Sequence, residues 1–170
     1  SGEEGKPATF TLTGPVNDGR VEMKLSAASL AGLLDGSDFE LEGSLFNPQS
    51  VVLAGQIGLD PLPFDADPDG SVTFRLTQPA AGPASVSAAF NAGTTSISAK
   101  GTAVLSAEDF ATGSLALSVK SDDIEPYLMM NGIALPQGGA GLPLTLQASV
   151  TTSADAIAIS DLAGKADQNG

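Results

Sequence analysis

The sequence predicts a mainly β protein, an antiparallel meander or curled sheet of about ten strands with two short helices. Three observations lead to this fold class. Short runs of alternating apolar and polar residues recur along the chain, Gly, Pro, Asn and Asp interrupt them, and only two segments depart from the alternation. Alternation with a period of two gives each strand one apolar and one polar face. Turn signals at roughly ten-residue intervals are typical of antiparallel strands joined in chain order.

The alternating runs define the predicted strands. In residues 21–25, for example, apolar side chains alternate with Glu22 and Lys24, so the two kinds point to opposite sides of the sheet. Each strand therefore contributes one apolar face. The apolar positions of the runs are Val21, Met23 and Leu25; Phe39, Leu41, Gly43 and Leu45; Val72, Phe74 and Leu76; Val86, Ala88 and Phe90; Leu115, Leu117 and Val119; and Leu142, Leu144, Leu146, Ala148 and Val150.

Two segments have helical spacing instead. Residues 26–36 carry three leucines spaced for one helix face, and residues 120–132 carry Ile, Tyr and Leu in the same arrangement. Pro126 is tolerated only in a first helical turn, so the N-cap of the second helix falls on Asp122 or Asp123. Both segments end at an Asp-Gly or Asn-Gly step, which stops a helix. We predict two helices of about two turns each.

The same elements occur twice in the same order. A strand and a helix at residues 21–30 align with residues 115–124, and a strand, a polar turn and a second strand at residues 39–55 align with residues 144–160. Chance similarity between β-rich segments is the alternative, but the shared order of three element types favours a repeat. We predict one β-rich module over residues 1–170, built from two related strand–helix–hairpin units at about 8–62 and 84–170.

The composition excludes several classes of function. The 170 residues include 7 Lys plus Arg and 20 Asp plus Glu, for a formal net charge of −13, and no Cys, His or Trp. Thiolate sites, zinc and haem sites of the usual ligand types, and His-based triads are therefore excluded. Nucleic acid is excluded as a partner, because phosphate binding depends on clustered Lys and Arg. We expect no cofactor.

The paired carboxylates do not predict an enzyme. Glu40 and Glu42 share one strand face about 7 Å apart, a separation that a glycosidase pair could have. One Tyr and no Trp leave little aromatic surface on which a sugar could stack. A solvated strand face with Lys24 or Arg20 across from it is the preferred interpretation, and we predict no catalytic residues.

The sharpest local motif is acidic. Asp65, Asp67 and Asp69, followed by Gly70, match the start of a calcium-binding loop. The twelfth position is Leu76, so the bidentate carboxylate that completes an EF-hand loop is missing. Two interpretations stay open: a calcium site, or an acidic loop that leads into the next strand.

The apolar faces of the strands are the other candidate site. They either pack into a closed core or stay partly open as a groove for acyl chains. Small residues on the apolar side, such as Gly43, Ala88 and Ala148, thin the core and permit curvature. A charge of −13 repels anionic head groups, so in a lipid complex the tails must dominate. The candidate lining residues are Val21, Met23, Leu25, Leu115, Leu117, Val119, Leu144 and Leu146.

Two motifs near the C-terminus resemble a known family. A D-hydrophobic-x-x-hydrophobic-hydrophobic helix runs from Asp123 to Gly132, and paired strands end in a hydrophobic-x-Asp-Leu-x-Gly step at 159–164. The combination resembles the C-terminal repeat region of the AsmA family, over residues 113–170 and, with fewer motif positions, 20–59. Residues 162–166 read like the start of a further strand, so we expect a fragment of a larger protein.

The resemblance implies an AsmA- or TamB-like protein of the Gram-negative envelope. Such a protein is anchored in the inner membrane by one helix, extends through the periplasm and serves outer-membrane assembly and maintenance. The implied structure is a long β-sheet with an apolar groove that conducts phospholipid, and no catalytic residues carry over. The implied partners are phospholipid acyl chains and envelope proteins, with membrane contact only through parts outside this chain. The alternative is an extracellular β-sandwich repeat of an adhesin or surface protein, stabilised by calcium at the Asp loop.

Overall fold

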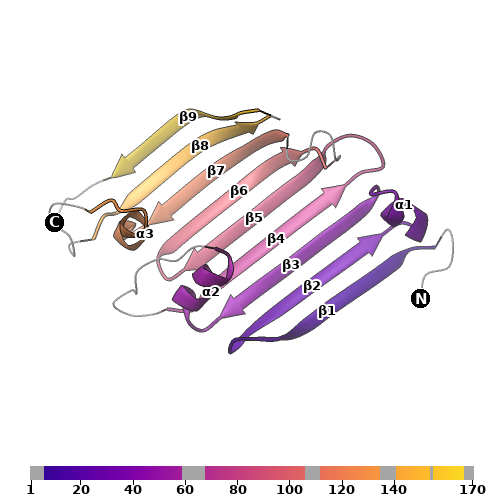
Figure 1. Cartoon of the computed structure of the whole chain (residues 1–170), viewed down its shortest axis with the longest axis horizontal. Helices are drawn as coiled ribbons and strands as arrows, with labels where there is room; N and C mark the ends of the chain where they lie inside the picture. Colours follow the sequence, from indigo (N-terminus) through magenta and orange to yellow (C-terminus); the bar gives the residue numbers. More distant parts are fainter. Residues whose placement is uncertain (1–5, 59–67, 106–111, 135–140, 154, 167–170) are drawn as a thin grey trace.

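Nine antiparallel strands form one open sheet in a computed structural model of the chain (Figure 1). The structure describes residues 6–58, 68–105, 112–134, 141–153 and 155–166. Every strand pairs with its neighbours in chain order, so the fold is a simple meander. The strands are β1 (Ala8–Val16), β2 (Gly19–Ala27), β3 (Phe39–Asn47), β4 (Gly70–Gln78), β5 (Ala84–Ala92), β6 (Thr95–Ala103), β7 (Gly113–Ser121), β8 (Leu144–Thr152) and β9 (Ile157–Ala166).

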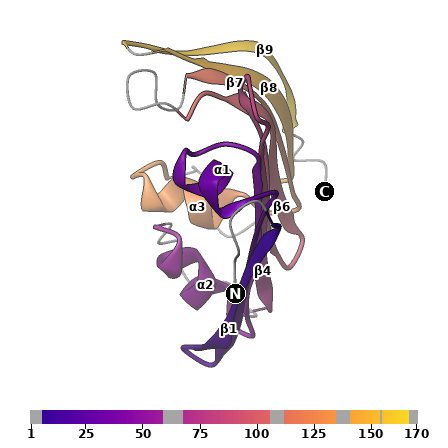
Figure 2. The ribbon, with the colours of Figure 1, turned by 90° about the vertical axis from the view of Figure 1, so that its right-hand side faces the viewer.

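Three short helices lie on the same side of this sheet (Figure 2). They are α1 (Leu30–Leu34), α2 (Ser50–Gln56) and α3 (Glu125–Met130). The helices α2 and α3 follow the odd-numbered strands β3 and β7 and lie at one end of the sheet, whereas α1 follows β2 and lies at the other end (Figure 1). None of the helices in the described residues is long and apolar enough to cross a membrane.

The predicted fold class is confirmed, with corrections to its details. The described residues are mainly β and antiparallel, but they form nine strands instead of about ten, in a sheet that is open instead of curled. Residues 51–55, predicted as the second strand of a hairpin, belong to α2. Residues 162–166, predicted as the start of a further strand, are the second half of β9. The β-sandwich of the alternative interpretation is not the architecture of the described residues, whose strands form a single sheet.

Burial explains why α2 is a helix. Its first backbone N–H, on Ser50, donates to the carbonyl oxygen of Pro68 at 2.8 Å. Leu53 and Ala54 face the sheet and are completely excluded from solvent. In a helix these two neighbouring side chains lie on the same buried side, whereas in a strand they would point to opposite faces. Tertiary packing therefore overrides the strand preference of Val51 and Val52. The predicted strand–helix–hairpin order therefore holds for the second unit and fails for the first.

The other two helices begin and end close to the predicted positions. Ser29 caps α1, its Oγ accepting a hydrogen bond from the Gly32 N–H at 3.0 Å. The N-cap residue of α3 is Ile124, not Asp122 or Asp123 as predicted. Nevertheless, the Asp123 carboxylate accepts the Glu125 N–H at 2.9 Å, so this side chain still satisfies a free donor of the first turn.

The buried core lies between the sheet and the helices α2 and α3. The rings of Phe90 on β5 and Tyr127 on α3 meet edge to face, with centroids 6.5 Å apart and an interplanar angle of 87°. Leu53 from α2 and Ile124 beside α3 complete the contact between helices and sheet. The buried members of this cluster are Leu53, Ala54, Phe90, Ala92, Ile124 and Tyr127.

Buried polar groups tie the same end of the sheet together. Asn47 is fully buried, where its side chain donates to the Asn17 carbonyl oxygen at 2.8 Å and accepts the Gln49 N–H at 2.9 Å. The Thr95 and Ser121 hydroxyls are 2.6 Å apart and bridge β6 and β7. Because each of these groups has a partner, burial does not leave it unsatisfied.

Candidate functional site: the apolar face of the sheet

The strand register gathers the apolar side chains into rows that cross the sheet on its helix-bearing face. The middle row, which we name the central row, has one residue from each of β1–β8 and half of its members are Gly or Ala. The central row comprises Leu12, Met23, Gly43, Phe74, Ala88, Ala99, Leu117 and Ala148.

Larger side chains flank the central row on both sides. Each flanking row contains one glycine, and its other members are Val, Leu, Ile or Phe. The row nearer α2 and α3 is Gly14, Val21, Leu45, Val72, Phe90, Ile97, Val119 and Leu146, and the row farther from them is Phe10, Leu25, Leu41, Leu76, Val86, Gly101, Leu115 and Val150.

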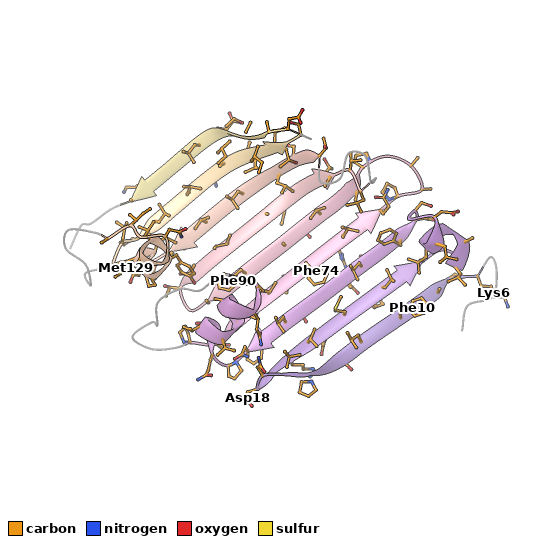
Figure 3. All side chains as sticks on the ribbon, viewed as in Figure 1. Lys6, Phe10, Asp18, Phe74, Phe90 and Met129 are labelled. Carbon is orange, nitrogen blue, oxygen red and sulfur yellow. The ribbon has the colours of Figure 1, made fainter. Side chains whose placement is uncertain are left out.

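The helices cover this face unevenly. Val72, Ile97 and Val119 of the nearer row pack against the core cluster under α2 and α3. At the β1 edge, Phe10 and Leu12 keep 51% and 60% of their surface exposed. Figure 3 shows where the helices cover this face. Phe90 lies beside α2, whereas Phe74 lies in the middle of the sheet, away from the helices. The face is therefore a closed core at one end and an accessible apolar surface elsewhere.

All eight predicted lining residues lie on this face and are half-buried. They form two separate groups, because β3–β6 separate β2 from β7. Val119 and Leu144 pack against the core cluster, whereas Met23 and Leu117 belong to the central row. Sequence reasoning named Gly43, Phe74, Ala88 and Ala148 as positions of the apolar face, and it missed Leu12 and Ala99, which lie in the same row.

Gly43 and Phe74 shape the central row. A Cβ atom at Gly43 would lie 2.6 Å from Cζ of Phe74, so the aromatic ring lies across the glycine. An aromatic ring that covers a glycine on a neighbouring strand compensates for the missing side chain. The ring therefore lies low against the sheet, and the next two residues along the row, Ala88 and Ala99, are small.

Charge is strictly divided between the two faces of the sheet. Across β1–β8, no Asp, Glu, Lys or Arg occupies a position on the helix-bearing face. The opposite, polar face carries the three carboxylates of β1–β8 and, with Lys165 of β9 included, six of the seven cations of the chain. The cations are Arg20, Lys24, Arg75, Lys100, Lys120 and Lys165, and the carboxylates are Glu22, Glu40 and Glu42.

Ion pairs on the polar face neutralise the carboxylate pair. Arg75 lies 2.8 Å from Glu40 and 2.7 Å from Glu42, and Lys24 lies 3.4 Å from Glu42. The hydrogen bond from Arg75, helped by that from Lys24, holds the pKa of Glu42 below its usual value. The predicted cation Lys24 is confirmed as a partner, whereas Arg20 pairs with Glu22 instead. Sequence reasoning missed Arg75, which becomes a neighbour of Glu42 only through the pairing of β3 with β4.

A shallow cavity of about 600 Å³ opens on this polar face over β1–β6. Hydroxyl side chains such as Thr11, Ser44 and Ser87 line it together with Lys24 and Lys100. Met23, Gly43, Phe74 and Ala88 of the central row also contribute to the cavity lining, whereas the hydroxyl and charged side chains that line it belong to the polar face.

The structure describes only one of the three aspartates of the predicted calcium loop. Asp65 and Asp67 lie outside the described residues, and Asp69 is exposed just before β4. Among the residues that the structure does describe, no three His, Cys, Asp or Glu side chains lie close enough together to hold a metal ion.

Comparison of the chain with protein-family models, with curated proteins and with solved structures gives no match.

Proposed function

We propose that this chain is a non-catalytic module of an AsmA-like protein of the Gram-negative periplasm, and that phospholipid acyl chains lie along the central row of its sheet. The full-length protein is anchored in the inner membrane and serves outer-membrane assembly and maintenance. The observation that carries the proposal is the uncharged, partly uncovered row of small residues between two rows of large ones. Hydrocarbon needs such a surface and no polar group, which fits a row that consists of Leu, Met, Gly, Phe and Ala.

The dimensions of the central row suit an acyl chain. From β3 to β8 the row crosses five strand spacings of about 4.8 Å each, or roughly 24 Å. One leaflet of a bilayer has a hydrocarbon thickness of about 15 Å, half of the whole core. Each methylene removed from water contributes about 0.8 kcal/mol, so a tail that covers half of the row gains several kcal/mol. Tail burial can therefore supply the affinity without help from the head group.

The charge distribution favours zwitterionic head groups over anionic ones. In the part of the chain that the structure describes, several acidic residues lie in turns or beside helices at the rim of the sheet, for example Asp35 and Asp38 next to α1 and Asp122 next to α3. An anionic head group at that rim is repelled, whereas the ammonium group of a zwitterionic head group is attracted. Most cations lie on the polar face, where a tail on the apolar face does not reach them. We therefore propose phosphatidylethanolamine-like lipids as the preferred ligands.

A matched pair of variants tests the proposal. Ala88→Glu places a carboxylate in the central row, and Ala116→Glu places the same charge on the polar face of β7. Both alanines are exposed, so neither change disturbs the core. Native mass spectrometry after incubation with vesicles of phosphatidylethanolamine and phosphatidylcholine measures bound phospholipid, and vesicles of phosphatidylglycerol test the head-group preference.

We expect the unmodified chain and Ala116→Glu to retain zwitterionic phospholipid equally. Ala88→Glu should lower the bound fraction at least about tenfold, because a carboxylate under an acyl chain loses its water without gaining a partner. If neither the unmodified chain nor its control binds phospholipid, or if both variants bind it equally, the central row is not a lipid site.

A further inference from the structure

The cavity on the polar face brings together three cations of an acidic chain. Lys24, Arg75 and Lys100 line it, and the strand register places them in a single row that crosses the sheet from β2 to β6. Ser87 belongs to the same row and also lines the cavity. The three helices of the described residues lie on the other side of the sheet (Figure 2), so none of them covers this cavity.

Carboxylates hold the Arg75 side chain along one edge only. Its Nε lies 2.8 Å from Glu40 and its Nη2 lies 2.7 Å from Glu42. Neither ion pair uses Nη1, which keeps two N–H groups that can donate hydrogen bonds. Because two contacts already fix the planar guanidinium, Arg75 loses little further conformational freedom when it binds an anion.

Lys100 supplies a second cation at the same height of the sheet. It is exposed, and none of the ion pairs of the described residues includes it. Ser87 on β5 separates it from Arg75, so the two backbones are two strand spacings, or about 10 Å, apart. A phosphate monoester carries about two negative charges at neutral pH and accepts several charge-assisted hydrogen bonds. One such group fits between the two long cationic side chains and above the short serine.

The next row of the polar face supplies hydroxyl groups. Ser44 and Thr73 are paired residues of β3 and β4, and both line the cavity. Thr73 is two residues from Arg75 on the same face of β4, a separation of about 7 Å. Hydroxyl side chains both donate and accept hydrogen bonds, so they match the hydroxyls of a polyol. A polyol, unlike a sugar ring, has no flat face that needs an aromatic surface.

The net charge of the whole chain does not decide the potential at this cavity. Charges more than about 8 Å away are largely screened at physiological ionic strength. No Asp or Glu occupies the polar face of β4–β8. Around the cavity the cations outnumber the carboxylates, so the local charge is positive. The cations are Arg20, Lys24, Arg75 and Lys100, and the carboxylates are Glu22, Glu40 and Glu42.

We propose that the cavity on the polar face binds a soluble polyol phosphate, with the phosphate between Arg75 and Lys100 above Ser87 and the polyol along Ser44 and Thr73. The site goes beyond the proposed lipid binding and does not depend on it. Because the site is exposed, we expect millimolar affinity that weakens as salt screens the charges.

An NMR titration of the isotope-labelled chain with glycerol phosphate locates the site and measures its affinity. We expect the largest amide shifts at Ser87 and its neighbours on β4 and β6. Glycerol phosphate should bind at least about fivefold more tightly than inorganic phosphate, because hydroxyl contacts add to the phosphate contacts. Glycerol without phosphate should cause no shifts at the same concentration.

Substitutions of single cations test the placement of the phosphate. Lys100→Gln should weaken binding of glycerol phosphate about fivefold. Lys120→Gln is the matched control, because it removes the same charge from an exposed position of the polar face on β7 that does not line the cavity. Arg75→Gln should weaken binding at least about tenfold, since it also leaves Glu40 and Glu42 without their guanidinium partner.

Three results would overturn the proposal. The first is the absence of shifts on the polar face at a large excess of glycerol phosphate, and the second is equal affinity for glycerol phosphate and inorganic phosphate. The third is equal weakening by Lys100→Gln and Lys120→Gln, which would indicate an unspecific effect of charge. Lipid binding is measured separately on variants of the central row, so the failure of one proposal leaves the other standing.

Discussion

Replacing Leu53 by Ala removes the side chain that fixes α2 to the sheet. Leu53 is completely buried, and its Cδ2 lies so close to Gly70 that a Cβ there would come within 2.7 Å of it. The substitution deletes three carbons, which corresponds to about 2.4 kcal/mol of transfer free energy at about 0.8 kcal/mol per group. The remaining cavity adds to this cost, so we expect the free energy of unfolding to fall by about 3–5 kcal/mol.

Urea unfolding followed by far-UV circular dichroism measures this loss as a lower transition midpoint at unchanged slope. Leu34→Ala is the matched control, because Leu34 in α1 is 79% exposed and its truncation should change the free energy by less than about 0.5 kcal/mol. A loss below about 1 kcal/mol for Leu53→Ala would show that α2 does not close one end of the apolar face, and would refute the packing argument.

Three further predictions concern polar groups. Burial raises the pKa of Tyr127 from 10.0 to about 12, outweighing the hydrogen bond with Thr95. The neutral ring therefore contributes stability that is complete below pH 10 and lost as the pH rises toward about 12. Urea unfolding should show a loss of about 2–3 kcal/mol over this range that is absent in Tyr127→Phe. Asn47→Ala removes a fully buried side chain with its hydrogen bonds to the Asn17 carbonyl oxygen and the Gln49 N–H and should cost about 1–3 kcal/mol, whereas exposed Asn91→Ala should cost almost nothing. Arg75→Gln should leave the urea midpoint nearly unchanged, because its ion pairs are solvent-exposed.

Most of the fold followed from local patterns. Alternation fixed which side chains of each strand share a face, and short turns fixed the pairing of neighbours, because both signals act over a few residues. The error at α2 had a different origin. Val51 and Val52 favour a strand locally, but the burial of Leu53 against β4 decides the structure, and that contact lies outside any local window.

The candidate site was predicted in its composition but not in its arrangement. The sequence identified Met23, Ala88 and Leu117 as apolar positions, yet their membership of one row depends on the register of five consecutive strand pairs. For the same reason Arg75 was missed as the partner of Glu42. The net charge of −13 argued against lipid binding in the sequence analysis. No charged residue, however, occupies an apolar position of β1–β8. Alternation separates charged from apolar positions within each strand, and the register joins the apolar positions of neighbouring strands into one uncharged surface.

The most direct test of the central claim locates a bound acyl chain on the protein. A phosphatidylethanolamine with a photoreactive diazirine in one tail is bound to the unmodified chain and cross-linked by light, and mass spectrometry identifies the labelled residues. We expect the label on the central row, at Ala88, Ala99 and Leu117. Label confined to the polar face, around the cavity lined by Lys24 and Lys100, would contradict the account.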